Sequence, residues 1–297
     1  MGEKYKKFNH SQLMTANDFE IYHYKDYRDK DGEKFNVDLH HHDFYEIYFF
    51  ISGDVTFSIE SKQYVLLPGD IILINPKELH QPKFGVGDQP YERIVLWIRK
   101  SCMARFKTKN EDLTECFESG EEGHSNLLRV GTQRQNNILK LLKLMIFEDE
   151  NDLYGNNFLK ACFFGQLLVE INRLMRETPY TYKPQDKGSA LASEVVNYIN
   201  SHYHEKISLE DLAAKFFMSK YHLSHEFNRV VGTSIYRYII QKRLLIAKQM
   251  LYENFSPTDV YQKCGFGDYA NFYRAFKAEY GISPKEFVNE IKKHEGY

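Results

Sequence analysis

The fold of this chain is decided by residues 207–251, ISLEDLAAKFFMSKYHLSHEFNRVVGTSIYRYIIQKRLLIAKQML, and by residues 265–284, GFGDYANFYRAFKAEYGISP. We compared this region with itself at an offset of 49 residues. The comparison aligns Leu223 with Phe272, Phe227 with Phe276, Gly232 with Gly281, and Ser234 with Ser283. The same motif therefore occurs twice.

Each copy has the order of elements of a helix-turn-helix. The first helices are predicted to start at Leu209 and Pro257, and the second helices at Ser219 and Asp268. Serines that mark helix starts in this region are Ser208, Ser256 and Ser283. Between the copies, the apolar spacing of residues 234–253 predicts a connecting helix.

The second helix of each copy has an apolar side and a polar side. Apolar residues four positions apart mark the buried side. The opposite side offers groups that can donate to bases or phosphates: Tyr221, Ser224, His225 and Asn228 in the first copy, and Tyr269, Ala270, Tyr273, Arg274 and Lys277 in the second. One copy alone would favour the other interpretation, a solvated helix face. Two copies with matched cores, caps and glycines favour a pair of recognition helices that can sit one DNA turn apart.

Over residues 207–287 the chain resembles the DNA-binding domain of the AraC/XylS family of transcriptional regulators. The resemblance implies seven helices, with the second helix of each motif in the DNA major groove. Carried over by position, it implies base contacts from Tyr221, Ser224, His225, Ala270, Tyr273 and Arg274, and phosphate contacts from Lys220, Tyr269 and Lys277. We expect unequal reading by the two helices, because the second copy has Arg274 and the stronger family signature.

Two residues depart from the family pattern. Tyr261 stands where the family usually has alanine, and Phe217 occupies the first turn, where glycine is common. Neither position is one that reads bases. They put the fine geometry of helix packing in question rather than the function.

The first third of the chain predicts short strands separated by turns. From Phe35 to about Ile98 the strand candidates are FYEIYFFI, VTFSIE, YVLL, IILIN and YERIVLWI. Closely spaced strands of this kind are typical of a β-barrel or sandwich. We expect this barrel to form the core of the N-terminal domain.

A run of histidines lies inside the predicted barrel. His40, His42, Glu46 and Gly53 fit the pattern H-x-H-x3-E-x6-G, and the later segment from Pro68 ends at His80. This pattern resembles the cupin family, whose metal-binding members would use His40, His42, Glu46 and His80 as ligands. In sensor domains of the AraC type the same pattern often has only a hydrogen-bonding or ligand-contacting role, so we assign these residues to an effector pocket and assign no metal. The expected pocket residues are His40, His42, Phe44, Glu46, Tyr48, Phe57 and His80.

Helical spacing returns at residues 133–177, which predict a helical hairpin. The resemblance implies that this region pairs two subunits, and a cover packed on the barrel is the alternative interpretation. Leu139, Leu142, Ile146, Leu167 and Leu174 could serve either purpose. The composition of residues 178–190 is that of a linker. The expected organisation is a sensor and dimerisation domain over 1–177, this linker, and a DNA-binding domain over 191–297, an α+β protein of two domains.

Length and composition limit the number of domains and the class of protein. A length of 297 residues exceeds the usual size of one domain, and 42% hydrophobic with 27% charged residues is typical of an ordinary globular protein. The net charge of −2 argues against an indiscriminate polycation. Four cysteines without a C-x-x-C pair fit a reducing compartment. Because no secretion or membrane segment is recognisable, we expect a cytoplasmic protein without a membrane partner.

Three functions remain open at this point. The first is a transcription regulator, an activator by family resemblance, that binds promoter DNA as a homodimer, works with RNA polymerase, and responds to a small-molecule effector, which could be a sugar. On this hypothesis the chain is not an enzyme, has no catalytic residues and needs no cofactor. The second is a metal-dependent cupin enzyme with an accessory DNA-binding domain. The third is an architectural DNA-binding protein that needs no effector.

Overall fold

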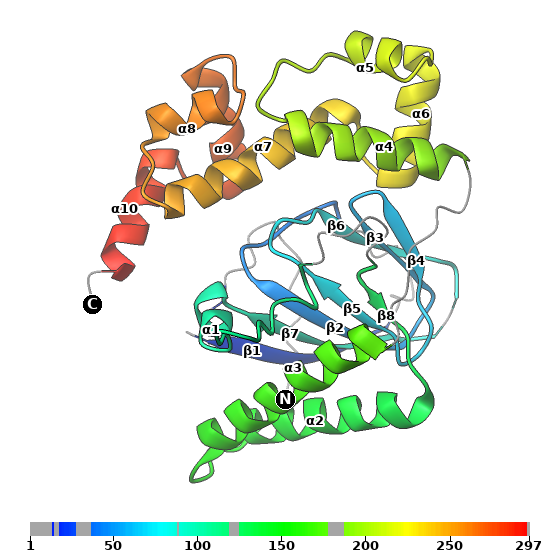
Figure 1. Cartoon of the computed structure of the whole chain (residues 1–297), viewed down its shortest axis with the longest axis vertical. Coiled ribbons are helices and arrows are strands. Elements are labelled where there is room, and N and C mark those ends of the chain that lie inside the picture. The colour runs from blue at the N-terminus through cyan, green and yellow to red at the C-terminus, as the bar shows by residue number, and fades with distance from the viewer. Residues whose placement is uncertain are drawn as a thin grey trace.

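The computed structural model describes residues 14, 18–27, 37–87, 89–118, 125–177 and 187–295. In these residues a β-sheet domain with a helical hairpin is followed by an all-helical domain (Figure 1). The α+β architecture expected from the sequence is thus confirmed. None of the helices in the described ranges is long and apolar enough to cross a membrane.

The N-terminal domain is built on two antiparallel sheets. The five-stranded sheet has the order β1-β7-β2-β5-β8 and the three-stranded sheet has the order β4-β3-β6. Their bounds are β1 Phe19–Asp26, β2 Tyr45–Ser52, β3 Val55–Ile59, β4 Lys62–Val65, β5 Ile71–Ile74, β6 His80–Phe84, β7 Tyr91–Ile98 and β8 Leu127–Leu128. The five strand candidates from the sequence correspond to β2, β3, β4, β5 and β7. The sheet also extends beyond the expected range of 35–98, because β1 pairs with β7 along its whole length.

Both faces of the five-stranded sheet are covered. Ile47 and Phe49 of β2 belong to an apolar cluster with the helical hairpin, whereas Tyr48 and Phe50 belong to a second cluster between the two sheets. Successive side chains of a strand point to opposite faces. A strand covered on both faces is mostly apolar, which explains why Glu46 is the one charged residue in the run FYEIYFFI.

The short helix α1 (Lys100–Ala104) follows the sheet, and the hairpin consists of α2 (Thr132–Glu150) and α3 (Asn156–Glu177). Three of the five hairpin residues left open by the sequence are core: Leu142, Leu167 and Leu174 are buried against the sheet. Leu139 and Ile146 are partly buried in the same cluster. The hairpin is therefore a cover for the sheet along these residues.

The C-terminal domain has seven helices among the described residues. They are α4 Lys187–His202, α5 Leu209–Lys215, α6 Lys220–Val231, α7 Ile235–Tyr252, α8 Pro257–Lys263, α9 Tyr269–Tyr280 and α10 Pro284–Glu295. The first four residues of α4 fall in the segment expected to be a linker, so 187–190 are helical. The rest of that segment, 178–186, lies outside the described residues. Two clusters form the core, one around α4 to α7 and one around α7 to α10.

The local structure of the two helix-turn-helix motifs follows the repeat in the sequence. Ser219 and Asp268 cap α6 and α9, each accepting a hydrogen bond from the backbone N–H three residues on. Gly232 and Gly281 end these helices in the left-handed conformation, with φ of +84° and +78°. Ser234 and Ser283 also match, since each accepts a hydrogen bond from the backbone N–H three residues on, and Ser283 forms a reciprocal capping box with Glu286. The three pairs of caps and glycines therefore have the same role in both copies.

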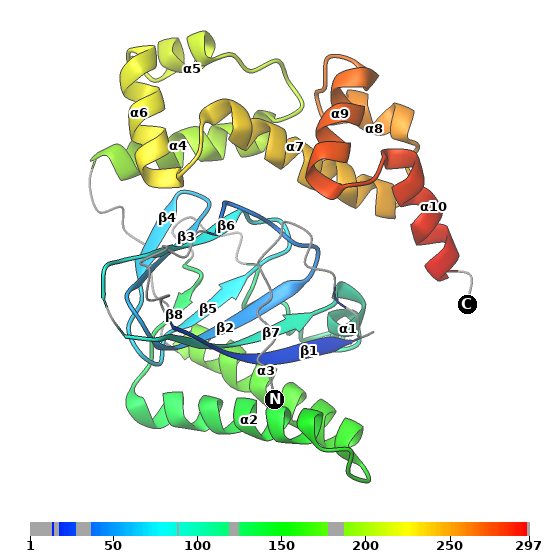
Figure 2. The ribbon, with the colours of Figure 1, turned by 180° about the vertical axis from the view of Figure 1, so that it is seen from behind.

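Both views of the ribbon place the helical domain at the end of the sheet domain formed by β3, β4 and β6 (Figures 1 and 2). The hairpin of α2 and α3 lies on the opposite side. The space between the two sheets is thus close to the helical domain. The hairpin is far from it.

Candidate DNA-binding surface and ligand pocket

The proposed reading faces of α6 and α9 are accessible. Tyr221 is 81% exposed, and His225, Ala270, Tyr273 and Arg274 are also exposed. Ser224 and Tyr269 are half-buried. The apolar side of each helix is fully buried, with Leu223 and Phe227 in one motif and Phe272 and Phe276 in the other. The structure thus separates the two sides of each helix as the sequence predicts.

The charged groups on these faces have local partners. Lys220 Nζ lies 2.7 Å from Glu210 Oε1, and His225 Nδ1 lies 3.1 Å from Glu226 Oε1. Arg274 donates from Nη2 to Asn271 Oδ1 at 2.6 Å. Such exposed pairs contribute little to stability, so these side chains can exchange their partners for DNA.

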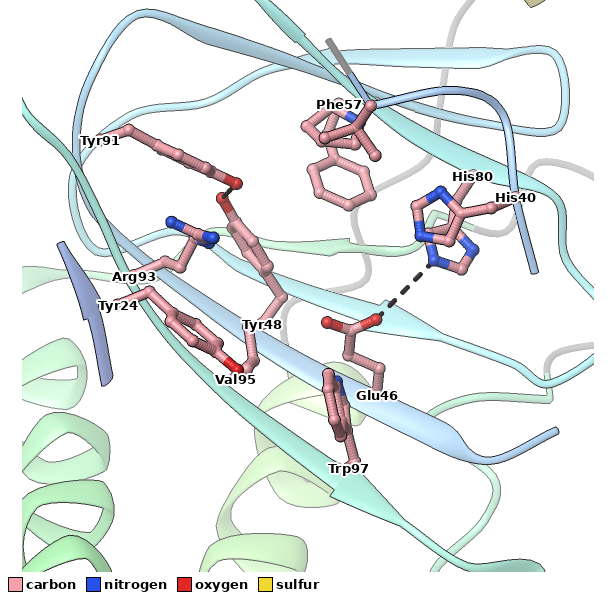
Figure 3. A pocket seen from close by; sticks show the side chains of 12 residues that line it. Tyr24, His40, Glu46, Tyr48, Phe57, His80, Tyr91, Arg93, Val95 and Trp97 are labelled. Atoms are coloured by element: carbon pink, nitrogen blue, oxygen red, sulfur yellow. Dashed lines mark hydrogen bonds and ion pairs between the residues drawn. The ribbon is translucent and has the colours of Figure 1, made fainter. Parts of the chain in front are cut away.

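A pocket opens between the two sheets (Figure 3). Its cavity volume is about 40 Å³, and it opens to solvent. Its lining comprises Tyr24, Val37, His40, Glu46, Tyr48, Phe57, His80, Pro82, Tyr91, Arg93, Val95 and Trp97. Five of the seven residues expected from the sequence are therefore in the lining: His40, Glu46, Tyr48, Phe57 and His80.

The other two expected residues, His42 and Phe44, do not line the pocket. The ring of His42 is stacked on that of Phe44 at a centroid distance of 3.9 Å, and Phe44 packs against Trp97. Both side chains are buried. His42 nevertheless belongs to one buried cluster with Glu46 and His80, and Phe44 belongs to the apolar cluster between the two sheets, so both are close to the pocket without lining it.

The sequence reasoning missed the contribution of β7. Tyr91, Arg93, Val95 and Trp97 alternate along this strand and all face the pocket. The guanidinium of Arg93 is buried, bonded to Asp26 Oδ2 at 2.5 Å and stacked on Tyr91 at 4.0 Å. The available signal was Arg93, a charged residue directly before the apolar run IVLWI, because buried arginines need partners.

Two tyrosines form the polar floor of the pocket beside Arg93. Tyr48 donates its hydroxyl hydrogen to Tyr91 Oη at 2.5 Å. Burial raises the pKa of Tyr48 far above its ordinary value, so the hydroxyl stays un-ionised. The pair presents neutral hydrogen-bonding groups to an occupant.

His42, Glu46 and His80 form a compact buried cluster at the opposite side of the pocket. The Nε2 atoms of His42 and His80 lie 2.9 and 3.8 Å from Glu46 Oε2. Burial lowers the pKa of His80 well below its ordinary value, so this ring is neutral. The ligand atoms of all three side chains lie within 4.8 Å of one another, close enough to hold one metal ion.

Glu60 joins the sheet domain to the helical domain. It lies in the turn after β3, and its carboxylate accepts hydrogen bonds from Tyr238, from Asn200 Nδ2 at 3.3 Å and from Lys242 Nζ at 3.0 Å. Burial alone would raise the pKa of Glu60, but the charge of Lys242 and these hydrogen bonds outweigh it and lower the pKa. Glu60 is therefore a charged contact between the sensor domain and helices α4 and α7, which pack around the first helix-turn-helix motif.

Residues 39–43 lie between the pocket and the helical domain and alternate between them. Leu39, His41 and Asp43 face the helical domain: Leu39 is buried in its first core cluster, His41 Nε2 lies 3.2 Å from Tyr280 Oη, and Asp43 Oδ2 lies 3.4 Å from Lys248 Nζ. His40 lines the pocket and His42 belongs to the histidine and glutamate cluster. The same alternation occurs at Leu79 and His80.

Comparison with known proteins assigns both halves of the chain. The profile described as an AraC-like ligand binding domain matches residues 24–161, and that described as a helix-turn-helix domain matches residues 212–290. The chain is similar to the HTH-type transcriptional activator RhaS of Klebsiella pneumoniae (strain 342), with 23% identity over 83% of this chain and 86% of the relative. RhaS of Yersinia pestis (strain Pestoides F) is 25% identical over 85% of this chain and 89% of the relative.

Two solved structures are also similar. The DNA-binding domain of AdpA in complex with a target DNA is 27% identical, with a TM-score of 0.34 over 35% of this chain and 94% of that chain. Unsaturated fatty acid bound ToxT from Vibrio cholerae strain SCE256 is 14% identical, with a TM-score of 0.40 over 93% of this chain and 97% of that chain.

The chain is a DNA-binding transcription regulator with a ligand-binding domain. It belongs to the AraC family.

Proposed function

We propose that this regulator is a transcription activator whose affinity for promoter DNA is set by a small-molecule effector in the pocket. The observation that supports this best is the alternation of residues 39–43 between the pocket and the helical domain. An occupant that moves His40 also acts on Leu39 and His41, which contact the helical domain. A ligand shifts such an equilibrium only through its different affinity for the two arrangements.

On the DNA side, we assign reading of bases to the exposed faces of α6 and α9. The base contacts are Tyr221, Ser224 and His225 in the first motif and Ala270, Tyr273 and Arg274 in the second, and the phosphate contacts are Lys220, Tyr269 and Lys277. Exposure of most of these side chains supports the assignment. Arginine is suited to bidentate bonding with guanine, so we expect Arg274 to contribute most.

The lining of the pocket favours a small polar effector with apolar faces, such as a sugar. Trp97 and Phe57 offer flat apolar surfaces, whereas Glu46, His80 and the Tyr48–Tyr91 pair offer hydrogen-bonding groups. A few convergent polar groups in a mostly aromatic pocket are typical of small-molecule sites.

We further propose a homodimer that contacts RNA polymerase when bound to DNA. Large apolar side chains are exposed at the turn of the α2–α3 hairpin: Phe147, Leu153, Tyr154, Phe158 and Leu159. Exposed apolar groups that gather in one place are typical of protein–protein contacts. This end of the hairpin is more suitable for pairing than the leucines buried against the sheet.

The relatives that match over most of the chain are named as transcription activators, which favours an activator over a repressor and a regulator over an enzyme. The cupin enzyme hypothesis depends on the His42, Glu46 and His80 cluster alone. The architectural hypothesis leaves the pocket without a purpose.

The test measures DNA binding of the full chain by fluorescence anisotropy. DNA from upstream of its own gene should bind more tightly than unrelated DNA, and the affinity should fall steeply with salt. A metabolite found by thermal shift should then change that affinity. Phe57→Trp, which fills the pocket, should abolish the response, whereas Leu67→Trp, at a site that is 50% exposed, should retain it. Equal binding to both DNAs would refute a specific regulator, and a metabolite that binds without changing DNA affinity would refute the coupling.

A further inference from the structure

The turns of the two helix-turn-helix motifs have the same backbone and different side chains. Each first helix is followed by a residue of left-handed conformation, Phe217 with a φ of +54° in the first motif and Gly265 with +78° in the second. In both turns the N–H of this residue donates to the carbonyl oxygen three residues back, and the next N–H donates to the one five residues back. Glycine is the usual residue at this position, because a Cβ is crowded in the left-handed region. The first motif therefore has a large side chain where the fold favours none.

The side chain of Phe217 does not fill a core. It is 94% exposed, and the next residue, Met218, is 40% exposed. In the second motif the residue equivalent to Met218 is Phe266, which is buried with its ring 5.3 Å from that of Phe272. Backbone strain persists in proteins mainly where it serves a function. Strain at Phe217 without any gain in packing indicates such a function.

The exposed pair lies at the end of α6 that is expected to enter the major groove of DNA. α6 begins at Lys220, directly after this turn, and Tyr221 in its first turn is 81% exposed. The N-terminal residues of a recognition helix are those that meet base edges. Both views of the ribbon place this end of α6 beside α5 and away from the sheets, whereas its other end, at Val230, is bonded to the sensor domain (Figures 1 and 2). The apolar patch of Phe217, Met218 and Tyr221 thus continues the proposed reading face.

Two exposed lysines flank the turn and favour DNA as the partner of this patch. Lys215 Nζ lies 4.5 Å from the centre of the Tyr198 ring, and Lys220 Nζ lies 2.7 Å from Glu210 Oε1. Such exposed contacts contribute little to stability, so both cations can turn to the phosphates of DNA. Between the phosphates, the apolar group that base edges present in the major groove is the 5-methyl group of thymine. An apolar side chain between two lysines matches that arrangement.

We propose that Phe217 is a DNA contact of the first motif and packs against the 5-methyl group of a thymine at the edge of the site read by α6. The inference rests on the proposed reading of DNA by this helix. Glycine is common at this position in the family, so the contact is a property of this chain. It gives the first motif, which has no arginine among its proposed base contacts, a sequence preference of its own.

The experiment measures binding of the full chain to DNA from upstream of its own gene, shortened by footprinting to one protected site. Each thymine is replaced in turn by deoxyuridine, which removes only the methyl group. Burial of one methyl group is worth about fourfold in affinity, so one thymine at the edge of the site should show a loss of about that size. In Phe217→Gly the same replacement should have no effect, and the unaltered site should already bind at least as weakly. Tyr27→Ala, at an exposed aromatic residue of the sensor domain, is the control and should bind as the wild type does.

Thermal unfolding shows whether the variants fold, and Phe217→Gly should unfold at the same temperature as the wild type or higher. If this variant binds the site as tightly as the wild type, or remains as sensitive to every deoxyuridine, the DNA contact is overturned. Tyr221→Ala then identifies the cause. Weaker binding by Tyr221→Ala would leave α6 as a reading helix and refute only the role of Phe217, whereas unchanged binding by both variants would refute reading by α6. Normal DNA binding of Phe217→Gly with loss of transcription by RNA polymerase would assign the ring to a protein contact and also overturn the proposal.

Discussion

The two helix-turn-helix motifs share one framework and differ in how they are attached. Each has a capped first helix of seven residues, a capped second helix of twelve residues and a left-handed glycine at its end. The first motif is attached to the sensor domain directly through Val230 of α6, whose carbonyl oxygen accepts from Gln63 Nε2 at 2.6 Å and from Lys83 Nζ at 3.2 Å. It is also attached indirectly, because Glu60 contacts α4 and α7, which pack around this motif. Its core even includes Leu39 and Leu79 of the sensor domain.

The second motif makes fewer contacts with the sensor domain than the first. Those described are His41 with Tyr280, and Asp43 with Lys248 and Tyr252 at the end of α7. All of them come from the segment that also lines the pocket. The difference indicates that the first motif is anchored to the sensor domain, whereas the position of the second motif can respond to the pocket.

The largest expected effect comes from removing Lys242, the cation of the first attachment. Lys242→Met leaves the buried Glu60 carboxylate without its ion-pair partner, which should lower the free energy of unfolding by about 3 kcal/mol. Lys248→Met is the matched change at the second motif, where the pair with Asp43 is longer and more exposed, and should cost about 1 kcal/mol or less. Urea unfolding followed by circular dichroism measures both. Equal losses would contradict the unequal attachment.

Low pH should break the same ion pair by protonating Glu60. The pKa of Glu60 is lowered in the folded protein, so its contribution to stability is present above the ordinary pKa of glutamate and is lost as the pH falls through the lowered value. In Lys242→Met the remaining burial favours the protonated acid, so that variant should instead gain stability as the pH falls from neutral. Unfolding curves between pH 3 and pH 7 distinguish the two signs. Parallel pH profiles for the two proteins would argue against an ion pair.

The next largest effect is expected from a substitution in the turn of the second motif. Gly265 has a φ of +78°, and a Cβ there would lie 2.6 Å from the carbonyl oxygen of His204. Gly265→Ala should therefore destabilise the second motif by about 2 kcal/mol. Gly267→Ala, in the same turn with no atom near the added Cβ, is the control and should change stability far less. Thermal unfolding measures both, and similar losses would mean that the turn is not restricted at Gly265.

DNA reading should differ between the motifs by a smaller free energy. Arg274→Ala should weaken binding to the operator by about 1 to 3 kcal/mol and relax its sequence preference, because a bidentate donor is lost. His225→Ala should cost less, since this ring has one donor or acceptor to offer and is paired with Glu226. Anisotropy titrations on one operator, with unrelated DNA alongside, compare the two variants. Equal losses on the operator would refute unequal reading.

Much of the helical domain could be predicted from the sequence because its signals are local. A cap such as Ser219 or a glycine such as Gly232 acts on its own helix, so the residue type alone indicates the structure. The offset of 49 residues did not, however, predict the difference in length between the two turns. The first helices start 48 residues apart, at Leu209 and Pro257, so the second turn is one residue longer than the first.

The pocket and the attachments could be predicted only in part because they depend on distant strands. His40, Glu46 and His80 were found through a pattern, but Arg93 faces the pocket only because β7 lies next to β2 in the sheet. Nothing around Glu60 in the sequence indicates Lys242, since 182 residues separate them. Contacts between domains need the tertiary arrangement, which no local pattern contains.

The smallest expected effect tests the departure at Phe217. This residue has a φ of +54° in the first turn and is 94% exposed, so it bears the strain of a left-handed conformation without the benefit of burial. Phe217→Gly removes that strain but adds freedom to the unfolded chain, and the net gain in stability should be about 0.5 kcal/mol. Met218→Gly, at the next position and without a positive φ, should lower stability instead. If both substitutions destabilise the protein in thermal unfolding, the exposed ring of Phe217 contributes something beyond the turn, and DNA binding of Phe217→Gly would show whether that contribution is a contact with DNA.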